Sequence, residues 1–431
     1  MSDFKIKKKY IYTVLSIIVF KVILELGYNL FVHRLYNYAG FTLEISLIKM
    51  VESYLIVIFL SYLLAKLDDY NKPSKVVFFI IYINLYIPIS SLYWLQDNSR
   101  VYYLVISLSL FILYIILTNV KNVKVSTLKE GSHIVIFVLL GITIFVYGYL
   151  ILTGGLERFN LNLLTIYQTR ETYSESTIPL MGYLLSWQAN IINLFFLIYS
   201  LIKKNKILIS VVLFSQILLF AMTNFRSFLL APLVVLALYF IMKKGFKNIL
   251  LLLISSSISL VLIILLSLYL MFGNVTLLSI FLRRLFFVPA NLHYLYYEFF
   301  EGIDKYRLSH SILSFVFENP YHITPIEKIA SEVLKSDTAA NVGIFGDAYL
   351  NFGLIGILIF IIIFGSILVL FDSVAIKSPL ILSMAIIIIP SMSLVNSALF
   401  TSLATHGILF AIFVTWLTST LFRKNERNRL L

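Results

Sequence analysis

The sequence predicts an all-α polytopic membrane protein with about 12 transmembrane helices. The chain has 431 residues, of which 60% are hydrophobic, and its mean hydropathy is +0.95. About 20 apolar residues cross a bilayer as a helix, and twelve stretches qualify, separated mostly by short turns that carry lysine. These stretches are residues 10–32, 45–66, 76–95, 101–120, 133–152, 181–202, 206–223, 227–242, 248–272, 344–371, 379–397 and 400–422.

Two connections are much longer than the others and divide the chain into five regions. Transmembrane helices are expected within 1–152, 181–272 and 344–431, and the long segments 153–180 and 273–343 lie between them. With twelve crossings, both long segments fall on the same side of the membrane. Because a connection of about 70 residues is far too long to be a simple link, we expect the functional site on that side.

The basic residues orient the predicted helices. With the N-terminus in the cytoplasm, the cytoplasmic segments carry 21 lysines and arginines, whereas the short loops opposite carry only Arg34, Arg100 and Arg226. Basic residues in short loops are retained on the cytoplasmic side, so both termini are predicted to be cytoplasmic. This asymmetry also accounts for the net charge of +13, so we expect a lipid bilayer and not nucleic acid as the partner.

Two pairs of charged residues fall inside predicted spans, where each charge costs about 2.5–3.5 kcal/mol on insertion scales. Lys21 and Glu25 share one helix face, as do Lys49 and Glu52. Such pairs either neutralise each other in the bundle interior or line a polar cavity.

The second long segment has its own predicted elements. It opens with Arg283 and Arg284 and continues into an aromatic stretch that either sits at the headgroup level or stacks on sugar rings. Thr324, followed by proline and then by Glu327, is a helix start. The apolar residues after it repeat at helical spacing, which predicts an amphipathic helix that lies on the membrane or closes over the bundle.

Three patches of the sequence belong together. They are Asn-Phe-Arg-Ser-Phe-Leu-Leu at 224–230, Arg-Arg-Leu-Phe-Phe-Val-Pro at 283–289, and Asn-Val-Gly-Ile-Phe-Gly-Asp-Ala-Tyr-Leu-Asn-Phe-Gly-Leu-Ile-Gly at 341–356. With the hydropathy plan, these patches resemble the oligosaccharide repeat unit polymerases, the O-antigen or capsule polymerases of the Wzy type. The resemblance implies a fold of the all-helical glycosyltransferase-C (GT-C) class in the bacterial cytoplasmic (inner) membrane.

The resemblance also implies a reaction. A growing glycan on a polyprenyl diphosphate is the donor, a lipid-linked repeat unit is the acceptor, and polyprenyl diphosphate leaves. Arginine suits the leaving group because its charge is permanent and its donors are bidentate. The candidates for diphosphate binding are Arg226, Arg283, Arg284, Arg158 and Arg170, with Arg226 first because its helix fixes its position. Arg226 has an alternative role as a surface arginine beside lipid phosphates.

The other expected site residues lie in the large segment and at the start of the helix after it. A base for the acceptor hydroxyl would be a histidine or a carboxylate, and the sequence leaves His322, His310, Asp347 and Glu318 open. The candidates for glycan binding are Tyr349, Asn351, Tyr296 and Tyr297, each of which has packing as its alternative role. No cofactor and no metal is implied, since residues 33–44 lack the acidic pair of cation-dependent membrane glycosyltransferases.

Other functions remain as alternatives. Twelve helices with both ends inside also suit a lipid-linked oligosaccharide flippase or another transporter, but a flippase has little use for the large outer segment. The related O-antigen ligases share a motif like Arg226 to Leu230, yet neither His310 nor His322 is followed by the glycine expected eight residues later. A chain-length regulator and a flippase are possible protein partners of a polymerase.

Overall fold

The described part of the chain is built from helices. The computed structural model describes residues 2–161, 178–311, 314–335 and 339–422, with side chains from residue 8 onward, and these ranges contain no β-strand. The first half comprises α1 (Ser2–Gly27), α2 (His33–Tyr36), α3 (Leu47–Leu67), α4 (Ser74–Ile81), α5 (Ile87–Leu95), α6 (Arg100–Asn119), α7 (Gly131–Leu152), α9 (Pro179–Trp187) and α10 (Asn193–Lys203). The second half comprises α11 (Lys206–Thr223), α12 (Arg226–Lys243), α13 (Leu250–Phe272), α14 (Val275–Leu278), α15 (Val288–Phe300), α16 (Pro325–Glu332), α17 (Ile344–Ala375), α18 (Leu380–Met392), α19 (Leu399–Ala404) and α20 (Ile408–Leu417).

The helices agree with a polytopic membrane protein. Within the described ranges, 12 helical stretches are long and apolar enough to cross a membrane, and eleven of them coincide with predicted spans. The twelfth, Val275–Phe300, lies in the segment expected to be a long loop, whereas the predicted span 379–397 forms a shorter apolar helix, Leu380–Val395. Arg283 and Arg284 interrupt the apolar run of Val275–Phe300, and for that reason the sequence predicts a loop there, although the mean hydropathy of this stretch equals that of Pro179–Lys203.

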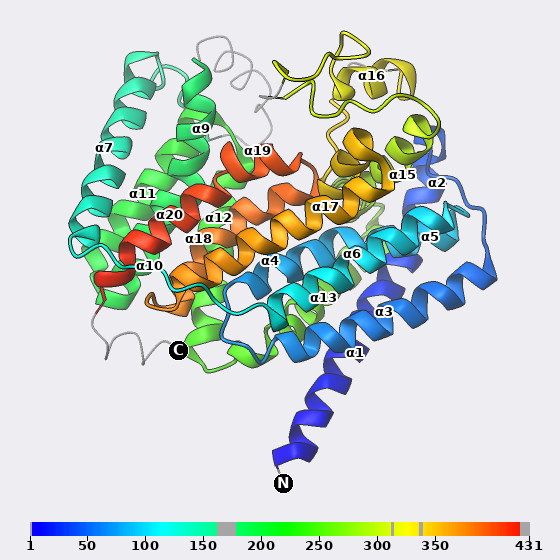
Figure 1. Ribbon diagram of the computed structural model, residues 1–431, viewed down its shortest axis with the longest axis horizontal. Helices are drawn as coiled ribbons and strands as arrows, with labels where there is room; N and C mark the ends of the chain where they lie inside the picture. Colours follow the sequence, from blue (N-terminus) through cyan, green and yellow to red (C-terminus); the bar gives the residue numbers. More distant parts are fainter. Residues whose placement is uncertain (1, 162–177, 312–313, 336–338, 423–431) are drawn as a thin grey trace.

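The long segment 273–343 leaves and re-enters the bundle at one end. α13 runs parallel to α1, since Ser16 lies 2.7 Å from Ser255 and the rings of Phe31 and Tyr269 are 4.9 Å apart. α17 runs parallel to α6 in the same way. Near this end, a bridge between Glu44 and Gln96 joins the connection that leads into α3 to the connection between α5 and α6. We call this the loop end of the bundle (Figure 1, where α15, α16 and α2 lie at the upper right).

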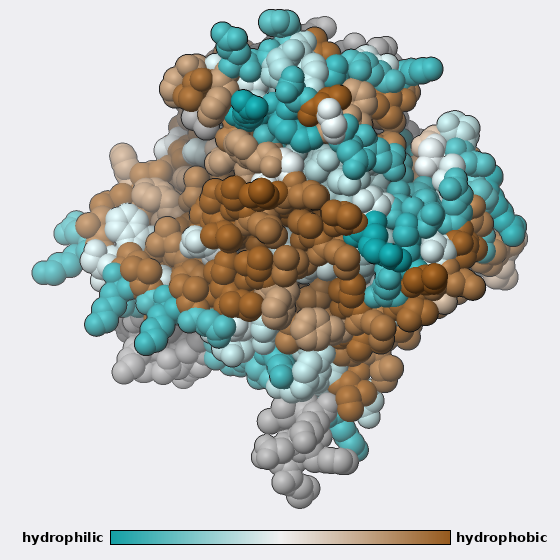
Figure 2. Space-filling model, turned by 45° about the vertical axis from the view of Figure 1, so that its right-hand side comes forward, coloured by the Kyte–Doolittle hydropathy of each residue, from teal (hydrophilic) through white to brown (hydrophobic). Residues whose placement is uncertain are grey.

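The opposite end gathers the lysine-bearing turns. Lys75 donates to the carbonyls of Asp68 and Lys247, and Lys72 donates to the carbonyl of Leu117, so turns far apart in sequence meet here. Between the two ends the surface is apolar: Figure 2 shows a hydrophobic band with hydrophilic residues above and below it. This arrangement suits a bilayer that surrounds the middle of the bundle.

Val275–Phe300 enters the bundle from the loop end and returns toward it. Its π-helical part, Ser279–Phe287, descends along α1: Ser279 accepts from the Tyr36 hydroxyl, and the Phe286 ring lies 5.6 Å from that of Phe20. α15 then returns to the loop end, where Tyr297 stacks 4.7 Å from Tyr102 at the start of α6. The helix is continuous through Val288–Pro289, where its π-helical part is followed by α15. Pro289 lacks the N–H group that would continue the hydrogen bonding of the preceding turn.

The charged pair on α1 is fully buried. Lys21 contacts Glu25 at 2.7 Å and also donates to Ser90 and Ser91 of α5. Glu25 accepts from Tyr54 of α3 and from Trp94 of α5. Every charge in this network is therefore compensated, and the pair ties three helices together.

Removal of one partner of this pair should destabilise the protein strongly. Lys21→Met leaves Glu25 without its cation, and an uncompensated buried charge costs about 3–5 kcal/mol. Lys21→Met/Glu25→Leu should recover most of that loss, because both charges are then absent. The measurement is reversible unfolding in detergent, with Lys49→Met as the matched control, since Lys49 pairs with the half-exposed Asp97. A Lys21→Met loss no larger than that of Lys49→Met would contradict this account.

Candidate functional site

α17 is broken near its start, and the break shapes the loop end. Phe352 and Gly353 are non-helical, and Gly353 has a φ of +65°, a conformation that favours glycine. Gly356 has no room for a side chain, because a Cβ there would lie 2.4 Å from the carbonyl oxygen of Ala348. The Phe-Gly-x-x-Gly run is thus the sequence of a helix break, with one glycine for the turn and one for a close approach.

The short helical piece before the break holds two neighbouring segments in place. The backbone N–H groups of Tyr306 and Arg307 donate to carbonyls at its end, and that of Leu308 donates to the side chain of Asn351 at 2.7 Å. Asn351 in turn donates to Asp347 at 3.0 Å, and the other carboxylate oxygen of Asp347 accepts from the backbone N–H of Leu399 at 2.9 Å. Asp347 and Asn351 therefore fix the loop 304–311 and the start of α19.

The loop that these residues fix separates two hollows. On its inner side is a cavity of about 300 Å³, and on its outer side is a groove of about 680 Å³. The cavity is lined by Tyr296, Leu308, His310, Ser311, Thr324, Pro325, Ile326, Asn341, Val342, Asp347, Leu350, Ser397, Ala398, Phe400 and Thr401. Three predicted site residues, Tyr296, His310 and Asp347, are thus brought together at one cavity.

His310 lines the cavity and has a ring nitrogen that makes no hydrogen bond to the described residues. Its Nδ1 atom is buried and has no hydrogen-bond partner among the described residues, and its ring packs edge-on against Tyr306 at 5.2 Å. Burial lowers the pKa of His310 to about 4, so the ring is neutral at pH 7. Asp347, by contrast, already accepts hydrogen bonds at both carboxylate oxygens. Of these two residues, only His310 has a polar side-chain atom with no hydrogen-bond partner among the described residues.

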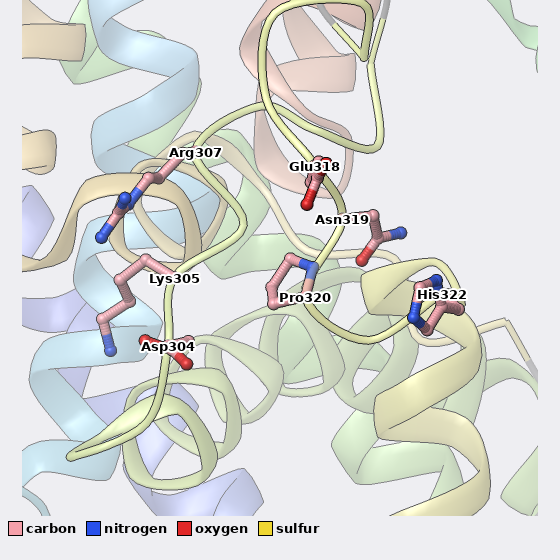
Figure 3. A pocket seen from close by; sticks show the side chains of 7 residues that line it. All are labelled: Asp304, Lys305, Arg307, Glu318, Asn319, Pro320 and His322. Carbon is pink, nitrogen blue, oxygen red and sulfur yellow. The ribbon is translucent and has the colours of Figure 1, made fainter.

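The outer groove carries His322 and Glu318, which the sequence left open as bases. Figure 3 shows Lys305 and Arg307 with their charged ends on the same side, away from Glu318 and His322. Lys305 donates to the carbonyl of Phe300 and lies over the Tyr349 ring at 4.6 Å. His322 is exposed and lines the groove but not the cavity. The sequence analysis did not single out Lys305 and Arg307. No motif shows that their loop hydrogen-bonds to the end of the short helical piece before the α17 break.

The predicted amphipathic helix is present and closes over the cavity. α16 starts with a capping box in which Thr324 and Glu327 satisfy each other's backbone N–H groups. These hydrogen bonds also lower the pKa of Glu327. Ile329 and Ala330 are buried on the inner face of α16, and the hydroxyl of Tyr296 donates to the carbonyl of Pro325 at 3.4 Å. α16 therefore lies on the bundle.

The predicted glycan-binding tyrosines are mostly buried against one another. Tyr349 packs 4.8 Å from Tyr297, and both contact Tyr102. Tyr296 donates to the carbonyl of Ala340 at 2.7 Å. Their rings form the floor beneath the loop, and Tyr296 is the one that lines the cavity.

The predicted arginines do not form one cluster. Arg158 and Arg226 belong to neighbouring segments, since Asn160 and Asn224, which lie beside them in sequence, are hydrogen-bonded at 3.3 Å. Arg283 lies elsewhere, stacked 4.1 Å over the Tyr36 ring near α2, with Arg284 beside it in sequence. Arg170 falls outside the described residues. Two groups of cations therefore occupy different parts of the loop end.

Neither a group of possible metal ligands nor a similar protein gives further information on this site. Among the described residues, no three histidine, cysteine or acidic side chains are grouped so that they would hold a metal ion. Comparisons with protein-family models, with curated proteins and with solved structures find no match to the chain.

Asn351 should prove essential for the order of the outer loop. Asn351→Leu removes the acceptor of the Leu308 N–H and the donor to Asp347, and each buried polar group left unpaired costs about 1–3 kcal/mol. We expect faster proteolysis within residues 304–326, detected by mass spectrometry of limited digests. Asn319→Leu, in the exposed part of the same loop, is the control. Equal digestion of the two variants would contradict the role of Asn351.

His310 should make stability depend on pH. Its pKa falls from the ordinary 6.5 to about 4 on burial, so between these values only the unfolded chain binds the proton. Stability is therefore complete above pH 6.5 and is lost as the pH falls toward 4, by up to about 3 kcal/mol. The measurement compares unfolding of wild type and His310→Gln from pH 7 to pH 4. Parallel profiles would show that His310 is not buried in the neutral form.

Proposed function

We propose that this protein is a glycosyltransferase that polymerises polyprenyl-diphosphate-linked oligosaccharide repeat units at the loop end of the bundle. The observation that carries the proposal is the cavity beside the α17 break. Residues within 341–356, the most specific patch of the family resemblance, line this cavity together with His310, whose Nδ1 atom is buried and makes no hydrogen bond to the described residues. The resemblance alone links this chain to a GT-C fold and to O-antigen or capsule synthesis. On this proposal the loop end faces away from the cytoplasm.

The cavity supplies what the acceptor hydroxyl needs. Attack of that hydroxyl on the anomeric carbon of the donor forms one C–O bond and breaks the C–O bond to the diphosphate. The hydroxyl proton passes to Nδ1 of His310, which is neutral at pH 7 and has no partner among the described residues. Asp347 and Asn351 act as positioning residues, because they hold the loop that carries His310.

The leaving group needs stabilisation of negative charge and no proton. Diphosphate is a weak base, so a fixed arginine is sufficient, and loss of one preorganised donor costs about 10²–10³ in rate. Arg226 opens α12 at the loop end, and Arg283 is held by Tyr36 and Ser279. Either group of arginines is placed to meet a diphosphate that a lipid tail keeps at the membrane.

The position of the cavity also bears on the rival functions. A flippase must let a whole oligosaccharide pass between the two ends of the bundle, whereas this cavity lies at the loop end, beneath α16. A ligase would use the same donor but transfer it to a different acceptor. The acceptor therefore decides between polymerase and ligase.

Purified protein incubated with a lipid-diphosphate repeat unit and a chelator should produce a ladder spaced by whole repeat units. No nucleotide sugar is needed, since the lipid-linked unit is both donor and acceptor. His310→Ala should lower the rate about 10²–10⁴-fold, the usual range for a general base, and Arg226→Ala should lower it about 10²–10³-fold. The products are resolved on a gel.

His133→Ala, at the opposite end of the bundle, is the matched control and should leave the ladder unchanged. No ladder, together with passage of the lipid-linked unit across vesicles that contain the protein, would make the protein a flippase. A ladder that His310→Ala leaves intact would reject the role given to His310.

A further inference from the structure

A third hollow lies in the apolar band, between α13 and the descending segment Ser279–Phe287. It measures about 240 Å³, and no polar atom is exposed on its wall. Its lining comes from both elements, and two of the lining side chains, Val261 and Phe281, are 45% and 38% exposed. The hollow is therefore an apolar crevice open at the surface of the bundle. Its lining residues are Ser257, Ile258, Val261, Leu262, Phe281, Leu285 and Phe286.

The crevice extends from near the loop end into the apolar band. On the descending segment its lining begins at Phe281, two residues after Ser279, which contacts Tyr36. On α13, which ends at Phe272, the lining residues lie roughly 15–22 Å before that end at a rise of about 1.5 Å per residue. The hydrocarbon core of a bilayer is about 30 Å thick, so the lower part of the crevice reaches the depth of acyl chains.

Two arginines lie on the same descending segment as the crevice wall. Arg284 stands in sequence between the lining residues Phe281 and Leu285, is exposed, and makes no ion pair among the described residues. Arg283 is held toward α2 by its stack on Tyr36. An arginine that a re-entrant segment carries below the loop end is costly in a bilayer, and such residues mark binding sites for charged groups.

An isoprenoid chain attached to a diphosphate fits both features. Its diphosphate matches the arginines, which bind phosphates through bidentate hydrogen bonds, and its hydrocarbon tail matches the crevice beside them. The volume is smaller than that of usual ligand pockets, about 300–1,000 Å³, so the crevice holds one stretch of the chain and leaves the rest in the bilayer.

We propose that the crevice between α13 and Ser279–Phe287 seats the polyprenyl tail of the lipid-diphosphate substrate, with its diphosphate at Arg283 and Arg284. This inference rests on the proposed function for the identity of the lipid, and it assigns that lipid to one side of the bundle.

The chain offers a direct test because it contains no cysteine. Val261→Cys places one thiol in the crevice, and Leu260→Cys places one on the same helix, at a position that is 59% exposed and outside the crevice. Each full-length variant is reconstituted in nanodiscs of stated phosphatidylcholine and phosphatidylglycerol content. The reaction of each thiol with N-ethylmaleimide is then followed by mass spectrometry.

Undecaprenyl diphosphate should slow labelling at position 261 at least tenfold and leave position 260 within twofold of its free rate. Additional phosphatidylglycerol should protect neither position. Arg284→Gln in the Val261→Cys background should abolish the protection. Equal labelling of both positions with and without undecaprenyl diphosphate would overturn the proposal, as would protection by phosphatidylglycerol, which would make the crevice an ordinary lipid contact.

The outcome is separate from that of the polymerisation assay. Protection at position 261 without a polymer ladder leaves the lipid site standing and rejects only the polymerase. A ladder without protection keeps the polymerase and rejects only the crevice.

Discussion

The hydrogen-bonded pair of Asp347 and Asn351 is the interaction on which the loop end depends. Gly353 interrupts α17 just after this pair, so the end of the short first piece is left with unpaired carbonyls that a second segment must satisfy. The loop 304–311 does so, and Asn351 adds a side-chain contact to Leu308 at 2.7 Å. Asp347 extends the same network to α19. One helix break thereby positions the cavity, its histidine and the groove outside it.

Charged groups inside the bundle are compensated by side chains of neighbouring helices. Lys21 and Glu25 are acceptable because serine, tyrosine and tryptophan side chains from two neighbouring helices complete their hydrogen bonds. Arg283 stacks on the ring of Tyr36 and donates a hydrogen bond to the hydroxyl of Ser279. Arg284 has no such compensation among the described residues, and this difference singles it out as a group available to a ligand.

Much of the helical plan was predictable from the sequence, because twenty-residue apolar runs and lysine-bearing turns are strong local signals. The capping box at Thr324 was equally readable, since its residues lie within one turn. The path of Val275–Phe300 was not, because Arg283 and Arg284 lower its hydropathy and only contacts with α1 reveal its descent. Likewise the meeting of His310 with Asp347 depends on pairing across a long loop, for which no spacing rule exists. The predicted arginines share a chemistry but not a location.

The most direct test of the account is to find where the glycan binds. A lipid-linked repeat unit that carries a photoreactive diazirine on its terminal sugar is cross-linked to the purified protein, and the labelled peptides are mapped by mass spectrometry. The account predicts labels in residues 304–326 and 397–401, on both sides of the cavity, with loss of those labels in Asn351→Leu. Labels at the lysine-bearing end, around Lys124 and Lys377, would contradict it, because the sugar would then occupy the opposite end of the bundle.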